Sequence, residues 1–213
     1  MFAKICALAL ICVATVQAGY PLYKQCDSRW GSDRLGSSSN TVCSAGCLMS
    51  SVSMVLNGCG RTISGAAATP KTLNNYLTNN GGYAQGDLFI WGSVATFGLS
   101  YVGQTGDKNA IRNYYSSGHA VILNVNNGGH WVLMTGESGT NFLVNDPGFS
   151  RTSYTAGDVV LAGVFKRPAG CNALLQTEEA AAVLELPALD PTPIQGMTAL
   201  FEQAEAAGFL QME

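Results

Sequence analysis

The sequence predicts an α+β domain, in which N-terminal helices pack on an antiparallel sheet formed by the second half of the body. Two observations lead to this prediction. Several segments between residues 46 and 117 begin with helix-capping residues and have the length of short helices. From residue 120 onwards, short apolar runs alternate with Gly and Asn turns, which is typical of antiparallel strands. Because helices precede strands instead of alternating with them, a doubly wound sheet is excluded.

Capping residues and glycines mark the expected helices. Thr69, Asp87 and Asp107 stand where N-cap residues belong, since their side chains accept hydrogen bonds from free backbone N–H groups. Gly58 and Gly118 stand where helices commonly end. The expected helices span residues 46–56, 70–78, 88–97 and 108–117.

Short apolar runs mark the expected strands, which span residues 120–125, 131–135, 141–144 and 159–165. The second and third strands form a hairpin with Thr135 and Asn141 near its turn. Residues 130 and 146 are therefore expected to lie close together at the open end of this hairpin.

Both ends of the chain differ from its centre. Residues 1–18 combine a single lysine with a 12-residue apolar run and small residues at Val16 and Ala18. This pattern is typical of a secretory signal peptide, and the run is too short for a membrane-spanning helix, which needs ~20 residues. We therefore expect an exported protein, extracellular or in the lumen of a secretory-pathway compartment. Its parts are a signal peptide (1–18), a body (19–170) and a tail (171–213).

The tail is acidic and the body is weakly basic. Residues 171–213 hold seven acidic residues and no Lys or Arg, whereas residues 19–170 hold 10 basic and seven acidic residues. Pro193, at the first position of a helix-like pattern, predicts that the tail is partly helical. Three roles stay open: the tail contacts the body and blocks a cleft, binds a partner, or stays solvated.

The whole chain of 213 residues has a net charge of −3, and only 12% of its residues are charged. Such a composition argues against a coiled coil, a disordered polyelectrolyte and a nucleic-acid-binding domain. It also provides no strong field that would attract an anionic membrane. We therefore expect neither nucleic acid nor, after signal cleavage, a membrane as a partner.

The cysteine count indicates disulfides and one working thiol. Of the seven cysteines, Cys6 and Cys12 leave with the signal peptide, and five enter an oxidising compartment. Because five is odd, two disulfides and one free thiol are the simplest arrangement. The five cysteines are Cys26, Cys43, Cys47, Cys59 and Cys171.

Cys47, His130 and Asp146 are the candidates for nucleophilic chemistry. Cys47 begins an expected helix, and the partial positive charge of a helix N-terminus stabilises a thiolate. His130 begins an expected strand, and Asp146 lies near it at the open end of the hairpin, where it could orient a histidine base. Structural interpretations stay open: the thiol pairs with Cys43 or packs, the histidine is structural, and Asp146 belongs to an Asp-Pro-Gly turn.

An ordered set of motifs surrounds these candidates: Tyr23-x-Gln25, Arg29-Trp30-Gly31, Cys43-Ser-Ala-Gly46-Cys47, Gly129-His130-Trp131-Val132 and Asn145-Asp146-Pro147-Gly148. In this order, the motifs resemble the papain-fold cysteine peptidases related to bacteriocin-leader-processing peptidases. The resemblance spans about residues 20–168. Leu48-Met49 departs from it, because members commonly have Gly-Pro after the nucleophile.

The resemblance implies a papain-like fold and a secreted cysteine peptidase that hydrolyses peptide or protein substrates through a thioacyl-enzyme, with no metal or cofactor. It implies that Cys47 is the nucleophile, His130 the general base and Asp146 the residue that orients it. Gln25 and the Cys47 backbone N–H would form the oxyanion hole. With Cys47 free, the other four cysteines form two disulfides in one of three connectivities. Residues 60–70, 79–87 and 98–107 would line the cleft.

Three alternatives remain open. A papain-fold amidase or acyltransferase would act on a non-protein amide such as peptidoglycan, with His119 in the place of Asp146. A zinc site would use Cys43, Cys47, His119 and His130 as ligands. A non-catalytic, disulfide-stapled binding domain would keep Cys47 paired or buried.

Overall fold

The computed structural model describes residues 19–171. The expected signal peptide and the acidic tail beyond Cys171 lie outside the described residues, so both stay predictions, as does contact between tail and body. Within residues 19–171, no helix has both the length and the apolar character that crossing a membrane requires.

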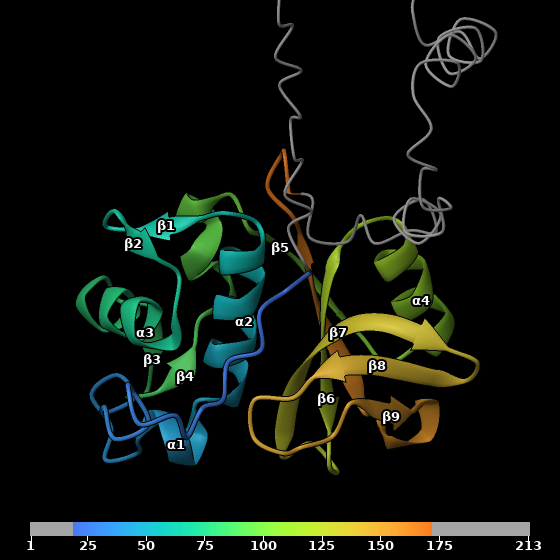
Figure 1. Cartoon of the computed structure of the whole chain (residues 1–213), viewed down its shortest axis with the longest axis horizontal. Coiled ribbons are helices and arrows are strands. Elements are labelled where there is room, and N and C mark those ends of the chain that lie inside the picture. The colour runs from blue at the N-terminus through green and yellow to red at the C-terminus, as the bar shows by residue number, and fades with distance from the viewer. Residues whose placement is uncertain (1–18, 172–213) are drawn as a thin grey trace, which may run out of the picture. The chain divides into compact units, whose positions relative to one another are not determined.

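The described residues form helices and an antiparallel sheet, which confirms the predicted α+β class (Figure 1). The helices are α1 (Val42–Ala45), α2 (Cys47–Gly58), α3 (Pro70–Asn79), the 3₁₀ helix η1 (Trp91–Phe97), α4 (Lys108–Ser116) and the 3₁₀ helix η2 (Ala156–Asp158). The strands are β1 (Thr62–Ile63), β2 (Ala66–Ala67), β3 (Tyr83–Ala84), β4 (Leu88–Phe89), β5 (Ser100–Thr105), β6 (Ala120–Val125), β7 (His130–Ser138), β8 (Asn141–Asn145), β9 (Ser153–Thr155) and β10 (Leu161–Lys166). The main sheet has the order β5-β10-β6-β7-β8-β9, and β1-β2 and β3-β4 form two small hairpins.

Three expected helices correspond to α2, α3 and α4, with ends that differ by one or two residues. Thr69 caps α3 through a hydrogen bond from the Thr72 backbone N–H, and Pro70 occupies its first position. Asp107 caps α4 in the same way through the Asn109 backbone N–H. Local capping chemistry therefore predicts these helices correctly.

The expected helix over residues 88–97 is wrong in its first part. β4 occupies the first two of these residues, and only the later ones form a helix, the 3₁₀ helix η1. Gln85 and Gly86 both have positive φ angles, 48° and 98°, and make the turn between β3 and β4. Asp87 is therefore the last residue of a hairpin turn instead of a helix cap, and its carboxylate accepts a hydrogen bond from Asn40 Nδ2 at 2.7 Å.

Residues 98–107, for which no strand was predicted, contain the edge strand β5. β5 pairs with β10, a strand from the far end of the body. β7 is also longer than expected and ends at Ser138, with an irregular register between Met134 and Gly136. These differences depend on partners that are distant in sequence or on bulges, which apolar patterning does not specify.

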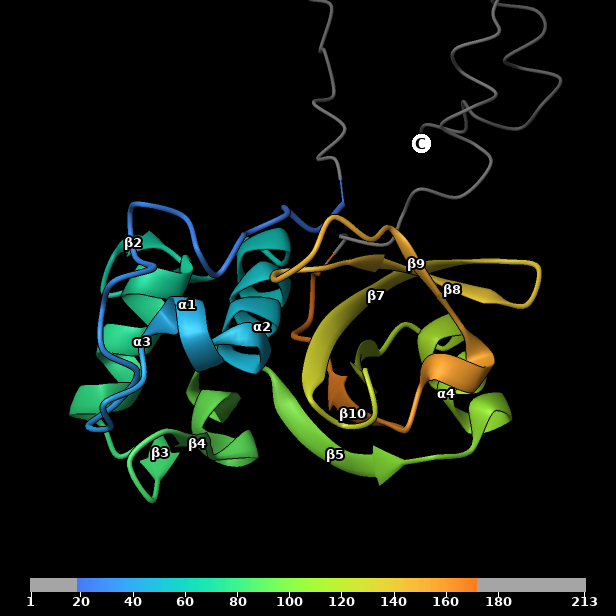
Figure 2. The same ribbon diagram turned by 90° about the horizontal axis from the view of Figure 1, so that it is seen from below.

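Both faces of the main sheet are covered. All six residues of β6 are buried, which explains why its sequence is an unbroken apolar run apart from Asn124. Ala120 and Ile122 belong to the core that contains α2, whereas Val121 and Leu123 belong to a second core with α4. Figure 2 shows the curved sheet wrapping around α4 on this second face.

α2 packs on β6 and β7 and lies between the sheet and α3 (Figure 1). The chain enters α2 directly from α1 through Gly46, the N-cap residue of α2. A methyl group on Gly46 would lie 2.5 Å from the carbonyl oxygen of Val42, so glycine permits this close passage. The helix thus presents its first residue, Cys47, at the junction between the helices and the sheet.

Candidate active site

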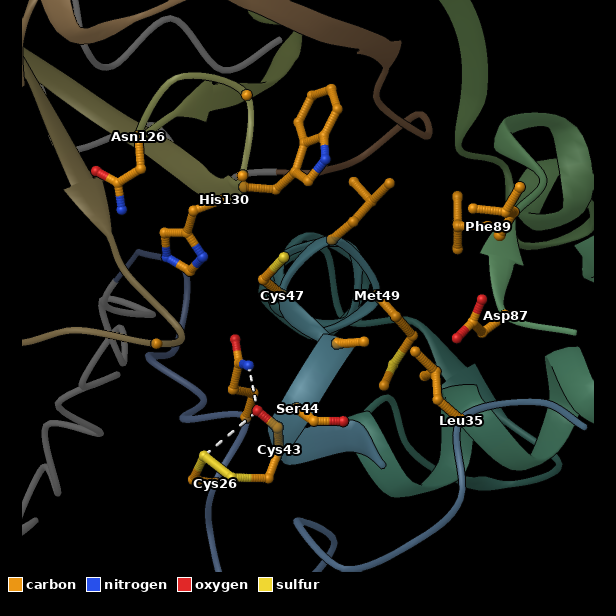
Figure 3. Close-up of a pocket in the computed structure, with 18 of the residues that line it drawn as sticks. Cys26, Leu35, Cys43, Ser44, Cys47, Met49, Asp87, Phe89, Asn126 and His130 are labelled. Atoms are coloured by element: carbon orange, nitrogen blue, oxygen red, sulfur yellow. Dashed lines mark hydrogen bonds between the residues drawn. A yellow bond between two sulfur atoms is a disulfide. The ribbon is translucent and has the colours of Figure 1, made fainter. Parts of the chain in front are cut away.

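Cys47 is a free and partly exposed thiol at the first position of α2. It lines a cleft of about 660 Å³ (Figure 3). The walls of this cleft come from residues 25–49, the β3–β4 hairpin, the β6–β7 turn and the loop after β8. Gln25 and His130 line the same cleft, so the structure brings three of the predicted site residues together.

Asp146, the fourth predicted residue, is bonded directly to His130. His130 begins β7, and Asp146 follows β8, the neighbouring strand in the sheet. The Nε2–H group of His130 donates to Asp146 Oδ1 at 2.8 Å. Both residues are buried, with exposed fractions of 6% and 1%. Figure 3 shows the imidazole ring turned toward Cys47, so that its other ring nitrogen is left for the thiol.

Four hydrogen bonds hold the Asp146 carboxylate. Besides the bond from His130, Oδ1 accepts from the backbone N–H groups of Gly148 and Phe149, at 2.8 Å each. Oδ2 accepts from the Tyr154 hydroxyl at 2.8 Å. Burial alone would raise the pKa of Asp146, but these donors lower the pKa below its ordinary value of 3.8. The carboxylate is therefore ionised at neutral pH and can stabilise an imidazolium.

The environment of His130 favours its protonated form. Burial alone would lower its pKa, but hydrogen bonds with the Asp146 carboxylate and with Cys47 raise the pKa of His130 from 6.5 to about 9. A protonated imidazole beside a thiol is the arrangement in which a reactive thiolate–imidazolium pair forms.

Gln25 is held through both its backbone and its side chain. Its backbone N–H donates to Pro147 O at 2.9 Å, and its side-chain Nε2 donates to Cys43 O at 2.5 Å. A primary amide has two N–H donors, so one remains for a group bound in the cleft. Gln25 Oε1 is buried and has no hydrogen-bond partner among the described residues.

Two disulfides frame this region. Cys26, next to Gln25, pairs with Cys43, whose carbonyl oxygen accepts from the Gln25 amide. Cys59, the residue after α2, pairs with Cys171 at the end of the described body. Of the three connectivities that the sequence allows, the structure thus has Cys26–Cys43 with Cys59–Cys171.

Three residues outside the predicted set support the site. Lys24 Nζ donates to Asp146 O at 2.7 Å and also to Phe149 O, which ties the N-terminal segment to the loop after β8. The Phe149 ring packs edge-on against His130, with ring centroids 5.0 Å apart. Tyr154 lies on β9, and its hydroxyl donates to Asp146 Oδ2. Partners that are 122 residues apart, as for Lys24, leave no signal in the sequence.

The structure does not support two of the alternative sites. His119 lies outside the cleft, in a small pocket of about 290 Å³ that also contains Arg167, so it does not replace Asp146. Cys43 is oxidised in a disulfide, which removes it from the suggested zinc ligands. Within residues 19–171, no three His, Cys, Asp or Glu side chains are arranged to hold a metal ion.

The free thiol of Cys47 also differs from what a fully stapled binding domain would show, because it is neither paired nor fully buried.

The expectation for the cleft walls is partly wrong. Residues 79–87 contribute to the cleft, but residues 60–70 and 98–107 do not. The latter two segments are taken up by the β1–β2 hairpin and by β5 at the far edge of the sheet.

The arrangement has the parts that acyl transfer to a thiol requires: a nucleophile, a base with an orienting carboxylate, and an amide donor in an open cleft. A family model described as Peptidase_C39 like family matches residues 17–165, which include Gln25, Cys47, His130 and Asp146. The curated proteins and the solved structures that were compared gave no match. Because the family model covers more than half of the chain, the protein belongs to the Peptidase_C39-like family, whose papain-like fold agrees with the observed α+β structure.

Proposed function

We propose that the protein is a secreted cysteine peptidase that hydrolyses peptide bonds, with Cys47 as nucleophile and His130 as general acid and base. The main support is the His130–Asp146 hydrogen bond of 2.8 Å beside a free thiol in an open cleft. Membership of the Peptidase_C39-like family supports a function related to cysteine peptidases.

In the acylation step, the Cys47 thiolate attacks the carbonyl carbon of the scissile peptide bond. The oxyanion that forms accepts hydrogen bonds from the free Gln25 N–H and from the Cys47 backbone N–H. The latter belongs to the first turn of α2, where backbone N–H groups have no intrahelical acceptor. The His130 imidazolium then gives its proton to the leaving amine, and the C–N bond breaks to leave a thioester on Cys47.

In the deacylation step, neutral His130 takes a proton from a water molecule, and the resulting hydroxide attacks the thioester carbonyl. The C–S bond breaks, the carboxylic acid leaves, and the Cys47 thiolate and His130 imidazolium are restored. Asp146 keeps the imidazole in the required orientation throughout, through its 2.8 Å bond with Nε2.

Secretion is part of the proposal. The two disulfides fit an oxidising compartment, and residues 1–18 have the pattern of an export signal. Expression of the full chain in a secretory host, followed by N-terminal sequencing of the exported protein, tests this point. We expect the mature chain to begin near Gly19.

A peptide-like electrophilic probe tests the nucleophile and its base. At pH 6, we expect the probe to modify Cys47 and the labelling rate to fall about 10²–10⁴-fold in His130→Ala, the range typical of general acid–base groups. His119→Ala is the matched control, because His119 is the only other histidine and lies outside the cleft.

The same variants are then assayed for cleavage of a mixed peptide library by mass spectrometry. We expect products from the native chain and from His119→Ala, and none from Cys47→Ala. Modification of a residue other than Cys47, or equal labelling rates in both histidine variants, would refute the proposed mechanism.

A further inference from the structure

One end of the cleft combines apolar walls with a single carboxylate. This part, called here the Asp87 end, is formed by Leu35, Met49, Tyr83, Asp87 and Phe89. Leu35 and Met49 are each only 2% exposed, so they form its floor, whereas the other three come from the β3–β4 hairpin. In Figure 3, Cys47 lies between His130 on one side and Met49, Asp87 and Phe89 on the other.

Asp87 is the only acidic residue that lines the cleft in the described part of the chain, and no Lys or Arg lines it. None of the ion pairs among residues 19–171 includes Asp87. The pKa of Tyr83, at the same end, is raised first by burial and second by the negative charge of Asp87. An uncompensated negative charge therefore acts on an otherwise apolar part of the cleft.

The hairpin that carries Asp87 is held in place from several sides. Asn40 Nδ2 donates to Asp87 Oδ2 at 2.7 Å, and the Ser37 backbone N–H donates to Gly86 O at 2.9 Å. The Tyr83 hydroxyl donates to the side-chain Oδ1 of Asn74, a residue of α3, at 2.9 Å. The carboxylate is thus preorganised, which reduces the entropy lost when it binds a charged partner.

The position of His130 decides which part of a substrate reaches Asp87. The imidazolium must lie next to the leaving nitrogen in order to protonate it, so the leaving side of the substrate occupies the His130 end. The acyl side, which stays on Cys47, then extends toward the opposite end, where Asp87 lies.

We propose that the Asp87 end binds a lysine or arginine side chain on the acyl side of the scissile bond, so that the protein prefers basic peptide substrates. This inference rests on the proposed peptidase function. Leu35, Met49 and Phe89 pack against the aliphatic stem of the side chain, and Asp87 pairs with its charged head.

Binding to the full-chain Cys47→Ala variant tests the preference without any turnover. Isothermal calorimetry compares three hexapeptides of an alanine background that contain one lysine, one norleucine or one glutamate. Because such a peptide can slide along the cleft, the cleavage site need not be known. We expect the lysine peptide to bind about tenfold more tightly than the norleucine peptide, and the glutamate peptide to bind most weakly.

Asp87→Asn, introduced into the same Cys47→Ala chain, isolates the charge. An amide oxygen still accepts from Asn40, so the hairpin is kept while the charge is lost. We expect the preference for lysine over norleucine to disappear in this variant. The matched control is Asp33→Asn, which removes a carboxylate that pairs with Lys71 outside the cleft and is expected to keep the preference.

Any of three results overturns the inference. These are equal affinity for the lysine and norleucine peptides, a preference for lysine that survives Asp87→Asn, and no measurable binding of any peptide. Cleavage of the same peptides by the native chain is measured in a separate experiment. Cleavage without a preference for lysine overturns only the basic-substrate inference. A binding preference that depends on Asp87, but without cleavage of any peptide, overturns only the proposed peptidase function.

Discussion

The orientation of the Asp146 carboxylate depends in part on Tyr154, which does not line the cleft. Its Oδ2 accepts the hydroxyl of Tyr154, a residue that is 2% exposed and lies on the edge strand β9. Tyr154 is therefore a positioning residue for the His130–Asp146 pair. Without its hydroxyl, the carboxylate would keep three donors and gain freedom to rotate.

Tyr154→Phe is expected to lower kcat several-fold with little change in KM and to cost about 1 kcal/mol of stability, the usual worth of one hydrogen bond. Loss of this donor also raises the pKa of Asp146, so the acidic limit of the pH–activity profile should move to higher pH. Steady-state kinetics across pH measure both effects, with the exposed Tyr101→Phe as control. An unchanged acidic limit would show that Tyr154 has only a structural role.

In the proposed mechanism, the pKa of His130 sets the alkaline limit of activity. Since hydrogen bonds with Asp146 and Cys47 overcome the effect of burial and raise this pKa to about 9, the imidazolium that protonates the leaving amine persists to that pH. We expect kcat/KM to fall above about pH 9, as measured with a peptide substrate. A fall centred near pH 7 would contradict the raised pKa.

The same shift links stability to pH. The folded protein binds the His130 proton more tightly than the unfolded chain, whose histidine pKa is near 6.5. This contribution to the free energy of unfolding is therefore fully present below pH 6.5 and is lost as the pH rises through about 9. Denaturation at several pH values should show this loss in the native chain and not in His130→Ala.

At the scale of elements, the structure separates what local sequence determines from what it does not. The caps Thr69 and Asp107 predict α3 and α4, because capping involves residues within one helical turn. The expected hairpin likewise brings His130 and Asp146 together, although its register is wrong, because Ser138 and not Thr135 lies opposite Asn141 at the turn. β5 was not predicted because its strand character depends on pairing with β10, far along the chain.

The same limit applies to the site. The motif order singles out Gln25, Cys47, His130 and Asp146, which the structure brings together at one cleft, whereas their catalytic roles stay predictions. Lys24 and Tyr154 are found only once distant segments are brought together. Asp87 was assigned to a helix cap, because Gln85-Gly86-Asp87 was not recognised as the turn of a hairpin. Its place in the cleft follows from that hairpin and not from its own sequence context.

The contact between η1 and β10 provides a prediction about packing. The Trp91 ring of η1 lies over Gly163 of β10, where a Cβ atom would come 2.1 Å from ring atom Cζ3. Gly163→Ala must therefore displace the indole and is expected to lower the free energy of unfolding by about 1–3 kcal/mol. Urea denaturation measures this loss. Gly92→Ala is the control, because a Cβ there meets no atom within 4 Å, and equal stability of both variants would contradict the prediction.

At the scale of the whole molecule, the Cys59–Cys171 disulfide joins two residues that are 112 positions apart. Chain-entropy arguments give about 4.7 kcal/mol for a loop of ~100 residues, and native disulfides commonly contribute about 2–5 kcal/mol. The double variant Cys59→Ala/Cys171→Ala should therefore unfold at a clearly lower temperature in calorimetry.

The same double variant should still label Cys47 at 10 °C, because the second disulfide lies outside the cleft. An unchanged unfolding temperature would mean that non-covalent packing alone holds the end of the body. Loss of Cys47 labelling in the folded variant would mean that this disulfide also shapes the cleft.

The Cys26–Cys43 disulfide lies close to the free thiol of Cys47, so neighbouring residues are in opposite redox states. In the proposed mechanism Cys47 acts only as a reduced thiol, whereas Cys43, in the helix just before it, is oxidised and accepts the Gln25 amide through its carbonyl. A strong reductant keeps the Cys47 thiol reduced but breaks the Cys26–Cys43 disulfide beside Gln25, and an oxidant does the reverse. Activity should therefore peak at an intermediate thiol–disulfide ratio, so the redox buffer belongs among the variables of any assay.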